Sequence, residues 1–558
     1  MKSWRSGMTL LLVVAILLTA FSGLCPIPAG AAPQQPKVHW SPCYRDMGYP
    51  FECTTVQVPL DYANPGRAAI SIAMVRLPAS DPARRIGSLF LNPGGPGGSG
   101  VDFALGAGPY LYSDEVRARF DMVGFDPRGI ARSTALRCFG TPRQWTGYFT
   151  PFAFPTTPEE EAIWEAADLY VVDACERRAG RIIDHMSTAD TARDLDLLRQ
   201  AVGDEMLTYA GYSYGTYLGV TYANLFPDRV RALLVDGVLD PIAWSTGEPG
   251  QGDTVPFSTR LRSDAGARDT LNQFFLLCDA GGANCAFASD SANRFAALYD
   301  GLLANPLVIV LPDGSTFTFT HSDLISNALG AMYDSFSWPS FAELLATIEA
   351  MAGPEEIGFR LQALWEDLGL ITKRGSPQYP NYVEGFPGVA CSDSDNPDNY
   401  AAWAAAADDA EANYGYFGRI WTWASSICAA WPGSQGSRFV GPFDGATANP
   451  VLVANTLYDP ATRYQGALTV HNLLPGSGLL TVEGWGHTTL FLSQCADQIV
   501  SDYLLYGTLP TEGTVCYQDW VPFTDGLEAL ALEAKAGRSR AIPAMVTDMV
   551  REATYTDH

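Results

Sequence analysis

Short apolar runs alternate with segments of helical periodicity over the first part of the chain. The runs Ser88–Leu91, Phe120–Phe125 and Ala232–Val235 are almost uniformly apolar, as is typical of strands buried on both faces of a sheet. Between them, Pro158–Arg178 and Ser187–Val202 place apolar residues at the spacing of a helix. This alternation predicts an α/β fold with a mostly parallel central sheet flanked by helices.

The pattern changes after Pro241. The stretch that follows is rich in helical periodicity, aromatic residues, glycine and proline. Its three amphipathic segments are Asp269–Cys278, Ser291–Leu303 and Phe341–Met351. Strand patterns return at Pro450–Asn455 and Gly478–Val482, which indicates that a large, mainly helical lid domain is inserted into the sheet. We predict a first core part over residues 32–241, the lid over 242–449, a second core part over 450–520 and a C-terminal helical tail over 521–558.

The N-terminus has the features of a secretory signal peptide. Two basic residues precede the apolar run Met8–Phe21, and the small residues Ala29-Gly30-Ala31 follow it. The run is too short for a comfortable membrane span. We expect residues 1–31 to be removed by cleavage after Ala31 and the protein to be secreted. Lipid attachment at Cys25 is less favoured, because Leu24 is larger than such processing sites usually allow.

Composition narrows the classes of partner. The formal net charge of -26 argues against nucleic acid and anionic membranes. The chain has 558 residues, of which 47% are hydrophobic, and this is enough for a large core and an inserted domain. It contains neither a Cys-x-x-Cys nor a His-Glu-x-x-His motif, so we expect no metal and no cofactor. We expect a monomer without a stable membrane partner.

Cysteine usage also indicates export. Of the 11 cysteines, Cys25 belongs to the predicted signal peptide, and an even number remains after its removal. In an exported chain this favours disulfides over metal ligation. Pairing of sequence neighbours would give Cys43–Cys53, Cys138–Cys175, Cys278–Cys285, Cys391–Cys428 and Cys495–Cys516, although the sequence alone leaves the connectivity open.

One pentapeptide, Gly211-Tyr212-Ser213-Tyr214-Gly215, predicts a nucleophile. It follows an apolar strand pattern, Met206–Ala210, and precedes a helical pattern, Thr216–Phe226. A strand, a tight turn and a helix are the context that a nucleophile elbow requires, and glycines let the serine adopt a strained backbone. The alternative is a chance Gly-x-Ser-x-Gly in a glycine-rich chain, which the flanking elements disfavour.

A serine hydroxyl needs a base to take its proton and an acid to orient that base. His487 is the best base, because it lies in Gly484-Trp485-Gly486-His487, directly after a strand. The other histidines suit the role less well: His39 and His185 precede Ser213, His321 is in the predicted lid, His471 is in a helix-like stretch, and His558 ends the chain.

Asp459 is the best acid, because it follows the strand Pro450–Asn455 on a short loop. Helix N-capping is its structural alternative, and Asp240 is its main rival. The order Ser213, Asp459, His487 is the triad order of the α/β-hydrolase fold.

The glycine-rich segment Asn92–Gly100 follows a strand and predicts an oxyanion loop. Neither the dinucleotide-binding nor the Walker spacing is present, which disfavours a phosphate site. We expect the tetrahedral oxyanion to be held by the N–H of Tyr214 and one from the Gly94–Gly95 region. Asp126 and Arg128, after the next strand, are expected to hold loops rather than to react.

These motifs resemble the secreted tripeptidyl aminopeptidases, relatives of the prolyl aminopeptidases among α/β-hydrolase serine peptidases. Four segments carry the resemblance: Asn92-Pro93-Gly94-Gly95-Pro96-Gly97-Gly98-Ser99-Gly100, Phe125-Asp126-Pro127-Arg128-Gly129, Gly211-Tyr212-Ser213-Tyr214-Gly215-Thr216 and Gly484-Trp485-Gly486-His487. The resemblance runs from about Trp40 to about Cys516. One departure is Ala131, where the family usually has glycine, and we expect a small local adjustment there.

The resemblance implies that short peptides are released from a free N-terminus, which requires an anion in the lid to bind the substrate ammonium. Glu384, Asp393 and Asp395 are the candidates. Each could instead be a solvated surface acid without a role in binding. Two other hypotheses stand beside the peptidase. One is a carboxylesterase that acts on uncharged acyl esters, and the other is a noncatalytic binding protein, which the complete triad disfavours.

Overall fold

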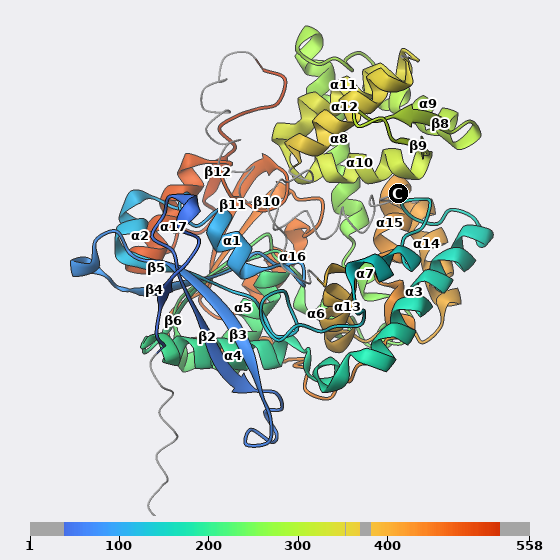
Figure 1. Cartoon of the computed structure of the whole chain (residues 1–558). Coiled ribbons are helices and arrows are strands. Elements are labelled where there is room, and N and C mark those ends of the chain that lie inside the picture. Colours follow the sequence, from blue (N-terminus) through green and yellow to red (C-terminus); the bar gives the residue numbers. More distant parts are fainter. Residues whose placement is uncertain (1–37, 352, 369–380, 525–558) are drawn as a thin grey trace, which may run out of the picture. The chain divides into compact units, whose positions relative to one another are not determined.

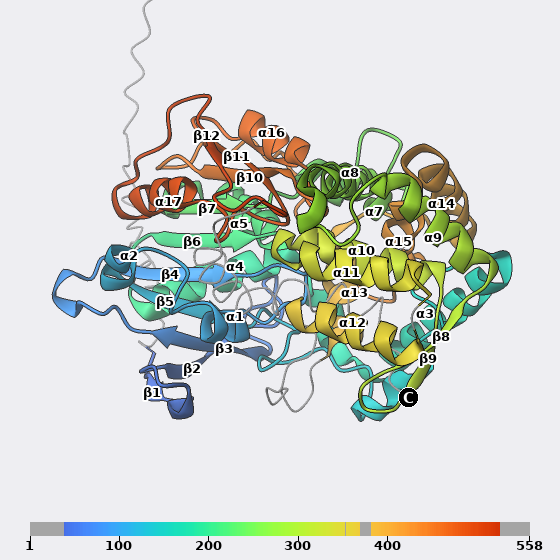
Figure 2. The same cartoon turned by 90° about the horizontal axis from the view of Figure 1, so that it is seen from above.

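A ten-stranded sheet organises the part of the chain that the computed structural model describes, residues 38–351, 353–368 and 381–524 (Figure 1). Its strands are β1 (Ser41–Pro42), β2 (Glu52–Pro59), β3 (Ala69–Leu77), β4 (Gly87–Asn92), β5 (Phe120–Phe125), β6 (Leu207–Tyr212), β7 (Val230–Asp236), β10 (Leu452–Tyr458), β11 (Gly478–Trp485) and β12 (Val515–Tyr517). Figure 2 shows them side by side in the order β1-β2-β3-β5-β4-β6-β7-β10-β11-β12.

The sheet is mostly parallel, as predicted. Every neighbouring pair from β5 to β12 is parallel, whereas β1, β2 and β3 add antiparallel pairs at one edge. The carboxyl ends of β6, β7, β10 and β11 therefore meet at the same edge, where ligand sites form in open α/β sheets.

Helices cover both faces, because successive side chains of a strand point to opposite sides. In β4, Leu89 and Leu91 belong to one buried cluster and Phe90 to another. The cluster with Leu89 includes residues of α1 (Gly100–Gly106), α2 (Asp114–Arg119) and α17 (Gln494–Tyr506). The cluster with Phe90 includes residues of α3 (Pro158–Arg178), α4 (Thr188–Val202), α5 (Tyr214–Leu225) and α16 (Tyr464–Leu473). The sheet is thus a layer between two helical layers.

The segment between β7 and β10 is mainly helical. Its helices are α6 (Pro241–Ser245), α7 (Phe257–Arg260), α8 (Ser263–Gly281), α9 (Ser291–Ala304), α10 (His321–Tyr333), α11 (Trp338–Glu349), α12 (Pro354–Asp367), α13 (Tyr382–Asp393), α14 (Tyr400–Tyr414) and α15 (Gly418–Trp423). It also contains an antiparallel hairpin of β8 (Leu307–Val310) and β9 (Thr316–Phe319), which the sequence did not lead us to expect. Most of α8 to α12 shares a separate hydrophobic core. The exact domain boundaries stay a prediction.

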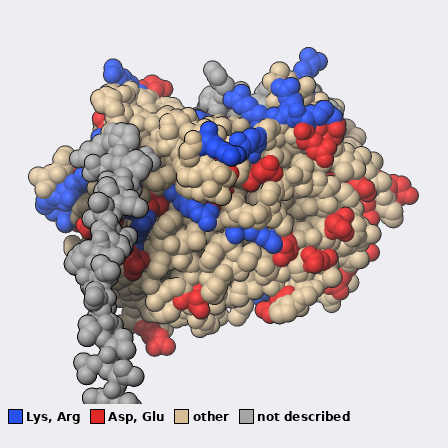
Figure 3. Space-filling view, turned by 90° about the horizontal axis from the view of Figure 1, so that it is seen from below, with Lys and Arg blue, Asp and Glu red and all other residues tan. Residues whose placement is uncertain are grey.

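Five disulfides join the cysteine pairs that neighbour pairing gave: Cys43–Cys53, Cys138–Cys175, Cys278–Cys285, Cys391–Cys428 and Cys495–Cys516. None of the described helices is long and apolar enough to cross a membrane. Figure 3 shows a face on which basic and acidic side chains are spread among uncharged ones. The predicted signal peptide and most of the predicted helical tail lie outside the described residues.

Candidate active site

Ser213 occupies the turn between β6 and α5. Its backbone has φ 55° and ψ −129°, a conformation that residues with a side chain rarely adopt. The flanking glycines make this turn possible: a Cβ on Gly211 would lie 2.2 Å from Gly215 O, and one on Gly215 would lie 2.7 Å from Asn92 O. The Ser213 N–H donates to Asp236 O at 3.1 Å, which fixes the turn against the end of β7. The geometry is that of a nucleophile elbow.

His487 and Asp459 meet because they follow adjacent parallel strands, β11 and β10. His487 Nδ1 lies 2.9 Å from each oxygen of the Asp459 carboxylate. Both residues are buried, with 5% and 1% of their surface exposed. The backbone N–H of His487 also donates to the backbone oxygen of Tyr333 at 2.9 Å. The rings of these two residues pack edge to face, with centroids 5.0 Å apart. The imidazole is therefore held in one orientation.

The Asp459 carboxylate accepts further hydrogen bonds from its own loop. Oδ1 accepts from the N–H groups of Ala461 at 2.9 Å and Thr462 at 2.8 Å, and Oδ2 accepts from Thr488 N at 3.1 Å. The Thr462 hydroxyl donates to Oδ2 at 3.0 Å and lies 3.3 Å from His487 Nδ1. Asp459 thus caps a turn and orients His487 at once, while α16 starts only at Tyr464.

Asp240, the rival acid, has a structural role. Its Oδ1 accepts from Ile242 N at 2.9 Å and Ala243 N at 3.0 Å, so it caps the start of α6. Among the described residues, no hydrogen bond or ion pair joins it to His487. Asp459 is the carboxylate that the structure brings to the imidazole.

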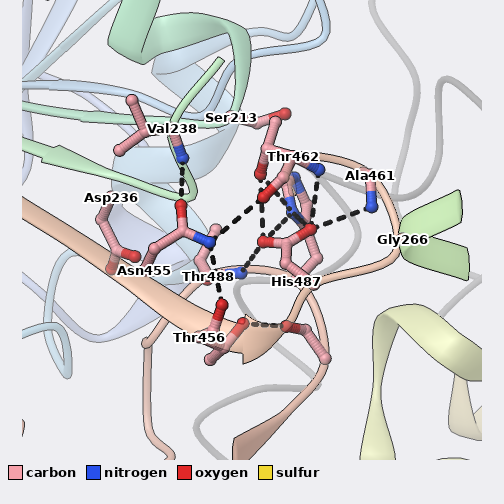
Figure 4. Close-up of polar contacts among 12 residues, drawn as sticks. Ser213, Asp236, Val238, Gly266, Asn455, Thr456, Ala461, Thr462, His487 and Thr488 are labelled. Carbon is pink, nitrogen blue, oxygen red and sulfur yellow. Dashed lines mark hydrogen bonds and ion pairs between the residues drawn. The ribbon is translucent and has the colours of Figure 1, made fainter. Parts of the chain in front are cut away.

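Ser213 and His487 lie in one cluster with Thr462 (Figure 4). Among the described residues, no hydrogen bond joins the Ser213 hydroxyl to the imidazole. Such bonds are often loose in an enzyme without substrate and tighten when substrate binds. The arrangement can supply a nucleophile, a base and an orienting acid.

Two of the three expected oxyanion donors are available. The Tyr214 N–H opens α5, where a helix has no internal acceptor for it. The Gly94 N–H donates to Asn92 Oδ1 at 3.0 Å, whereas no hydrogen bond within the described residues uses the Gly95 N–H. Gly94 instead gives room to the elbow, because a Cβ there would lie 2.8 Å from Ser213 Cβ. Tyr214 and Gly95 remain as candidate donors.

Known proteins resemble this chain over most of its length. A family model described as alpha/beta hydrolase fold matches residues 87–275, and one described as TAP-like protein matches residues 413–516. The serine protease Hip1 of Mycobacterium tuberculosis is 32% identical, over 86% of this chain and 91% of Hip1. The chain belongs to the TAP-like family of α/β-hydrolases. It is a serine peptidase or hydrolase of that fold.

Two further relatives of this TAP-like hydrolase have different names. Carboxylesterase B of Mycobacterium tuberculosis is 32% identical, over 89% of this chain and 92% of the esterase. Tripeptidyl aminopeptidase of Streptomyces lividans is 28% identical, over 88% of each chain. Relatives of similar likeness thus include both a peptidase and an esterase, so substrate preference rests on the site itself.

The three acids expected to bind a substrate ammonium have partners within the TAP-like chain. Glu384 is fully buried, and its Oε1 accepts from Cys138 N at 3.1 Å. Asp393 is fully buried and accepts from Thr188 N at 2.8 Å, and burial raises its pKa to about 7. Asp395 forms an ion pair with Arg438 at 2.6 Å. Each of these acids thus already serves as a hydrogen-bond acceptor or an ion-pair partner within the chain.

Two residues that hold the loops of the candidate triad were not predicted from the sequence. One is Thr462, described above. The other is Asp236, which ends β7 and accepts from Thr489 N at 2.9 Å and Thr489 Oγ1 at 2.8 Å. Asp236 is buried, which raises its pKa to about 7. Its signal in the sequence is an acid at the carboxyl end of a predicted strand, a frequent place for site residues.

Ala131 shows how the TAP-like chain tolerates its departure from the family motif. Its φ of 43° lies in the left-handed region that favours glycine. The Ala131 N–H donates to Asn381 Oδ1 at 2.9 Å, which holds the loop in place. The loop keeps a left-handed backbone, and an L-residue in that region costs about 1 kcal/mol.

Proposed function

We propose that this TAP-like hydrolase is an exported aminopeptidase that releases tripeptides, or other short units, from the free N-termini of peptides. One observation carries the proposal: an imidazole held at 2.9 Å by both oxygens of Asp459 lies in one cluster with the strained serine of the elbow. The named activity of a full-length relative, tripeptidyl aminopeptidase, supports the choice of substrate. The five disulfides support export, because such bonds persist in oxidising compartments.

In the proposed mechanism, each residue of the candidate triad acts from the position that it has in the structure. Ser213 Oγ attacks the scissile carbonyl while His487 Nε2 takes its proton, and Asp459 stabilises the imidazolium through Nδ1. The N–H groups of Tyr214 and Gly95 bind the oxyanion of the tetrahedral intermediate. Collapse of this intermediate releases the shortened peptide as an amine, which His487 protonates. Water, activated by the same imidazole, then hydrolyses the acyl-enzyme and frees the N-terminal unit.

The second candidate is a carboxylesterase. It is favoured by the name of the relative carboxylesterase B and needs the same triad and oxyanion donors. The two functions differ in what they ask of the substrate N-terminus, because an acyl ester carries no ammonium. Four chromogenic substrates separate them: a free-amine tripeptide anilide, its N-acetylated form, a prolyl anilide and a short-chain acyl ester.

We expect cleavage of the free-amine tripeptide anilide but not of its N-acetylated form. Replacement of the nucleophile in Ser213→Ala should lower kcat by about 10⁴-fold or more, since the hydroxyl has no substitute. Asp459→Asn should lower kcat by about 10⁴-fold, because the neutral amide no longer holds the imidazole in its working tautomer. Steady-state rates on purified, folded variants measure both losses.

Asp240→Asn is the matched control for Asp459→Asn. Asn can still cap α6, so kcat should stay within a few-fold of that of the native enzyme. If Asp240→Asn were the inactive variant, the acid would be wrongly assigned. Ester turnover with no anilide cleavage would instead overturn the peptidase assignment and leave the triad intact.

A further inference from the structure

An aromatic pocket adjoins the candidate active site. Its aromatic lining consists of Tyr148, Trp164, Tyr333, Phe386, Trp421 and Trp423. Two of these residues also border the site. Tyr333 packs against the His487 ring, and Phe386 N lies 3.2 Å from the place a Cβ on Gly97 would occupy. The pocket therefore lies against both the base and the glycine-rich loop.

A buried carboxylate, Asp168 of α3, forms part of the pocket wall. Only 2% of its surface is exposed. Its Oδ2 accepts from Ser426 Oγ at 2.5 Å, and Ser426 Oγ in turn accepts from Trp164 Nε1 at 2.9 Å. These contacts fix where the carboxylate points without neutralising its charge.

Asp168 lacks a cationic partner. Among the described residues, no lysine, arginine or histidine forms an ion pair with it, whereas buried Asp194 pairs with Arg128 at 2.6 Å. A buried carboxylate without a partner is costly, and the charge is usually avoided by keeping the proton. Burial, together with the nearby Glu165 carboxylate, accordingly raises the pKa of Asp168 to about 8. A cation that entered the pocket would stabilise the ionised form.

The rest of the lining suits a peptide. Ser326 Oγ, Trp421 Nε1 and Trp423 Nε1 are buried and make no hydrogen bond to any described residue. Buried polar groups are normally paired, so unpaired ones in a pocket point to a ligand that supplies acceptors. Peptide carbonyls are such acceptors. The indole and phenyl rings around them also attract a cation through their negative faces.

We propose that Asp168 binds the free α-ammonium of the peptide substrate in this pocket. The inference rests on the proposed aminopeptidase function and names its specificity determinant. It places the anion on α3, ahead of the elbow in the chain, and not among the acids of the lid segment considered from the sequence. A substrate held by its ammonium here presents one of its carbonyls to Ser213, so the span from the pocket to Ser213 would set the length of the released unit.

The test compares a substrate that carries the ammonium with one that does not. In Asp168→Asn the shape of the side chain is kept and its charge is lost. We expect the ratio of kcat/KM for the free-amine tripeptide anilide to kcat/KM for the acyl ester to fall about 10²-fold, since a desolvated charge pair is lost. Asp173→Asn is the matched control, because Asp173 is on the same helix, is 57% exposed and pairs with Arg177. It should leave the ratio unchanged.

A second measurement covers the case in which Asp168→Asn does not fold. Ester hydrolysis by the native enzyme is inhibited competitively, first with a free-amine tripeptide amide and then with its N-acetyl form. We expect only the free amine to inhibit, and its inhibition constant should rise about tenfold in Ser426→Ala, which loses the hydrogen bond that orients Asp168. Circular dichroism and thermal melting show which variants are folded.

The outcomes separate the inference from the proposed function. If the native enzyme cleaves the free-amine anilide and folded Asp168→Asn keeps the native ratio, the inference is overturned and the aminopeptidase stands. If the native enzyme cleaves only esters, the aminopeptidase fails. In that case the ammonium site is supported if the free-amine tripeptide amide inhibits ester hydrolysis and Ser426→Ala weakens this inhibition. The ammonium site is overturned if the N-acetyl amide inhibits equally well.

Discussion

Thr462 links the acid and the base of the candidate triad. Its hydroxyl donates to Asp459 Oδ2 at 3.0 Å and lies 3.3 Å from His487 Nδ1. The carboxylate therefore receives donors from several directions, and the imidazole meets it in one fixed position. A positioning residue of this kind acts through the triad and does not touch substrate, so its removal should affect every substrate alike.

We expect Thr462→Val to lower kcat/KM about tenfold on both anilide and ester substrates. Valine keeps the volume but removes the hydroxyl, so the carboxylate loses one hydrogen bond to a charged acceptor, worth about 1.5 kcal/mol. Thr462→Ser retains the hydroxyl and should stay within about twofold of the native kcat/KM. Equal rates for the valine and serine variants would show that the hydroxyl does not position the triad. Parallel pH–rate profiles measure whether the apparent pKa of the base has moved.

At the residue scale, the predicted residues that the structure brings together are those for which reactive chemistry and a strand end coincide. Ser213, Asp459 and His487 each follow a strand pattern, and elimination among six histidines left one base. Asp168 was not predicted, because its burial and its hydrogen bond to Ser426 are tertiary contacts that no local pattern shows. Its signal in the sequence was an acid at helical spacing from Trp164 and Val171, on an otherwise apolar face.

At the scale of elements, Asp393 ties α13 to the start of α4. Its carboxylate accepts from Thr188 N at 2.8 Å and Thr188 Oγ1 at 2.5 Å, and the same hydroxyl contacts the Tyr214 hydroxyl. The contact joins a helix of the inserted segment to the layer behind the elbow. All three residues are buried, so water cannot replace a lost partner.

Asp393→Ala should therefore destabilise the protein by about 2–3 kcal/mol, because it leaves the Thr188 N–H buried without its acceptor and takes from the Thr188 hydroxyl its carboxylate partner. The measurement is the midpoint of urea unfolding followed by tryptophan fluorescence. Asp398→Ala is the control, since Asp398 is exposed just beyond α13, and it should change stability by less than about 0.5 kcal/mol. Similar midpoints for the two variants would mean that the tie between α13 and α4 contributes little.

Helices and strands with a clear periodicity of apolar residues were predictable from the sequence. Elements that form only through tertiary contacts were not. The pattern Ser291–Leu303 predicted α9 to within a residue, because its apolar positions recur at helical spacing. The hairpin β8–β9 lies inside a segment that looked wholly helical. Its strands are four residues each, too short for a clear period of two. The two strands are defined by their pairing with each other, which is a tertiary contact, so no local sequence pattern predicts them.

At the scale of the whole molecule, buried acids should make stability depend on pH. Burial raises the pKa of several carboxyl groups, among them Asp168 to about 8, Asp236 and Asp393 to about 7, and Asp323 to about 6. In the unfolded chain such groups titrate near pH 4. Between these values the folded state holds protons that the unfolded state has lost, so its stability falls as pH rises.

We expect the melting temperature to be several degrees higher at pH 5.5 than at pH 8.5. Each buried acid contributes about 1.4 kcal/mol per pH unit between its unfolded and folded pKa, and the formal charge of -26 adds self-repulsion at high pH. Exposed acids with lowered pKa, such as Asp81 and Asp313, act in the opposite sense but only below about pH 4.

Asp236→Asn separates the buried acids from general charge repulsion. Asp236 ends β7, only 1% of its surface is exposed, and burial raises its pKa to about 7. Asparagine cannot ionise, so the variant should lose part of the decline in melting temperature between pH 5.5 and pH 7. Glu355→Gln removes one charge at an exposed position of α12 and should leave that slope unchanged. If both variants flatten the slope equally, net charge and not burial sets the pH dependence.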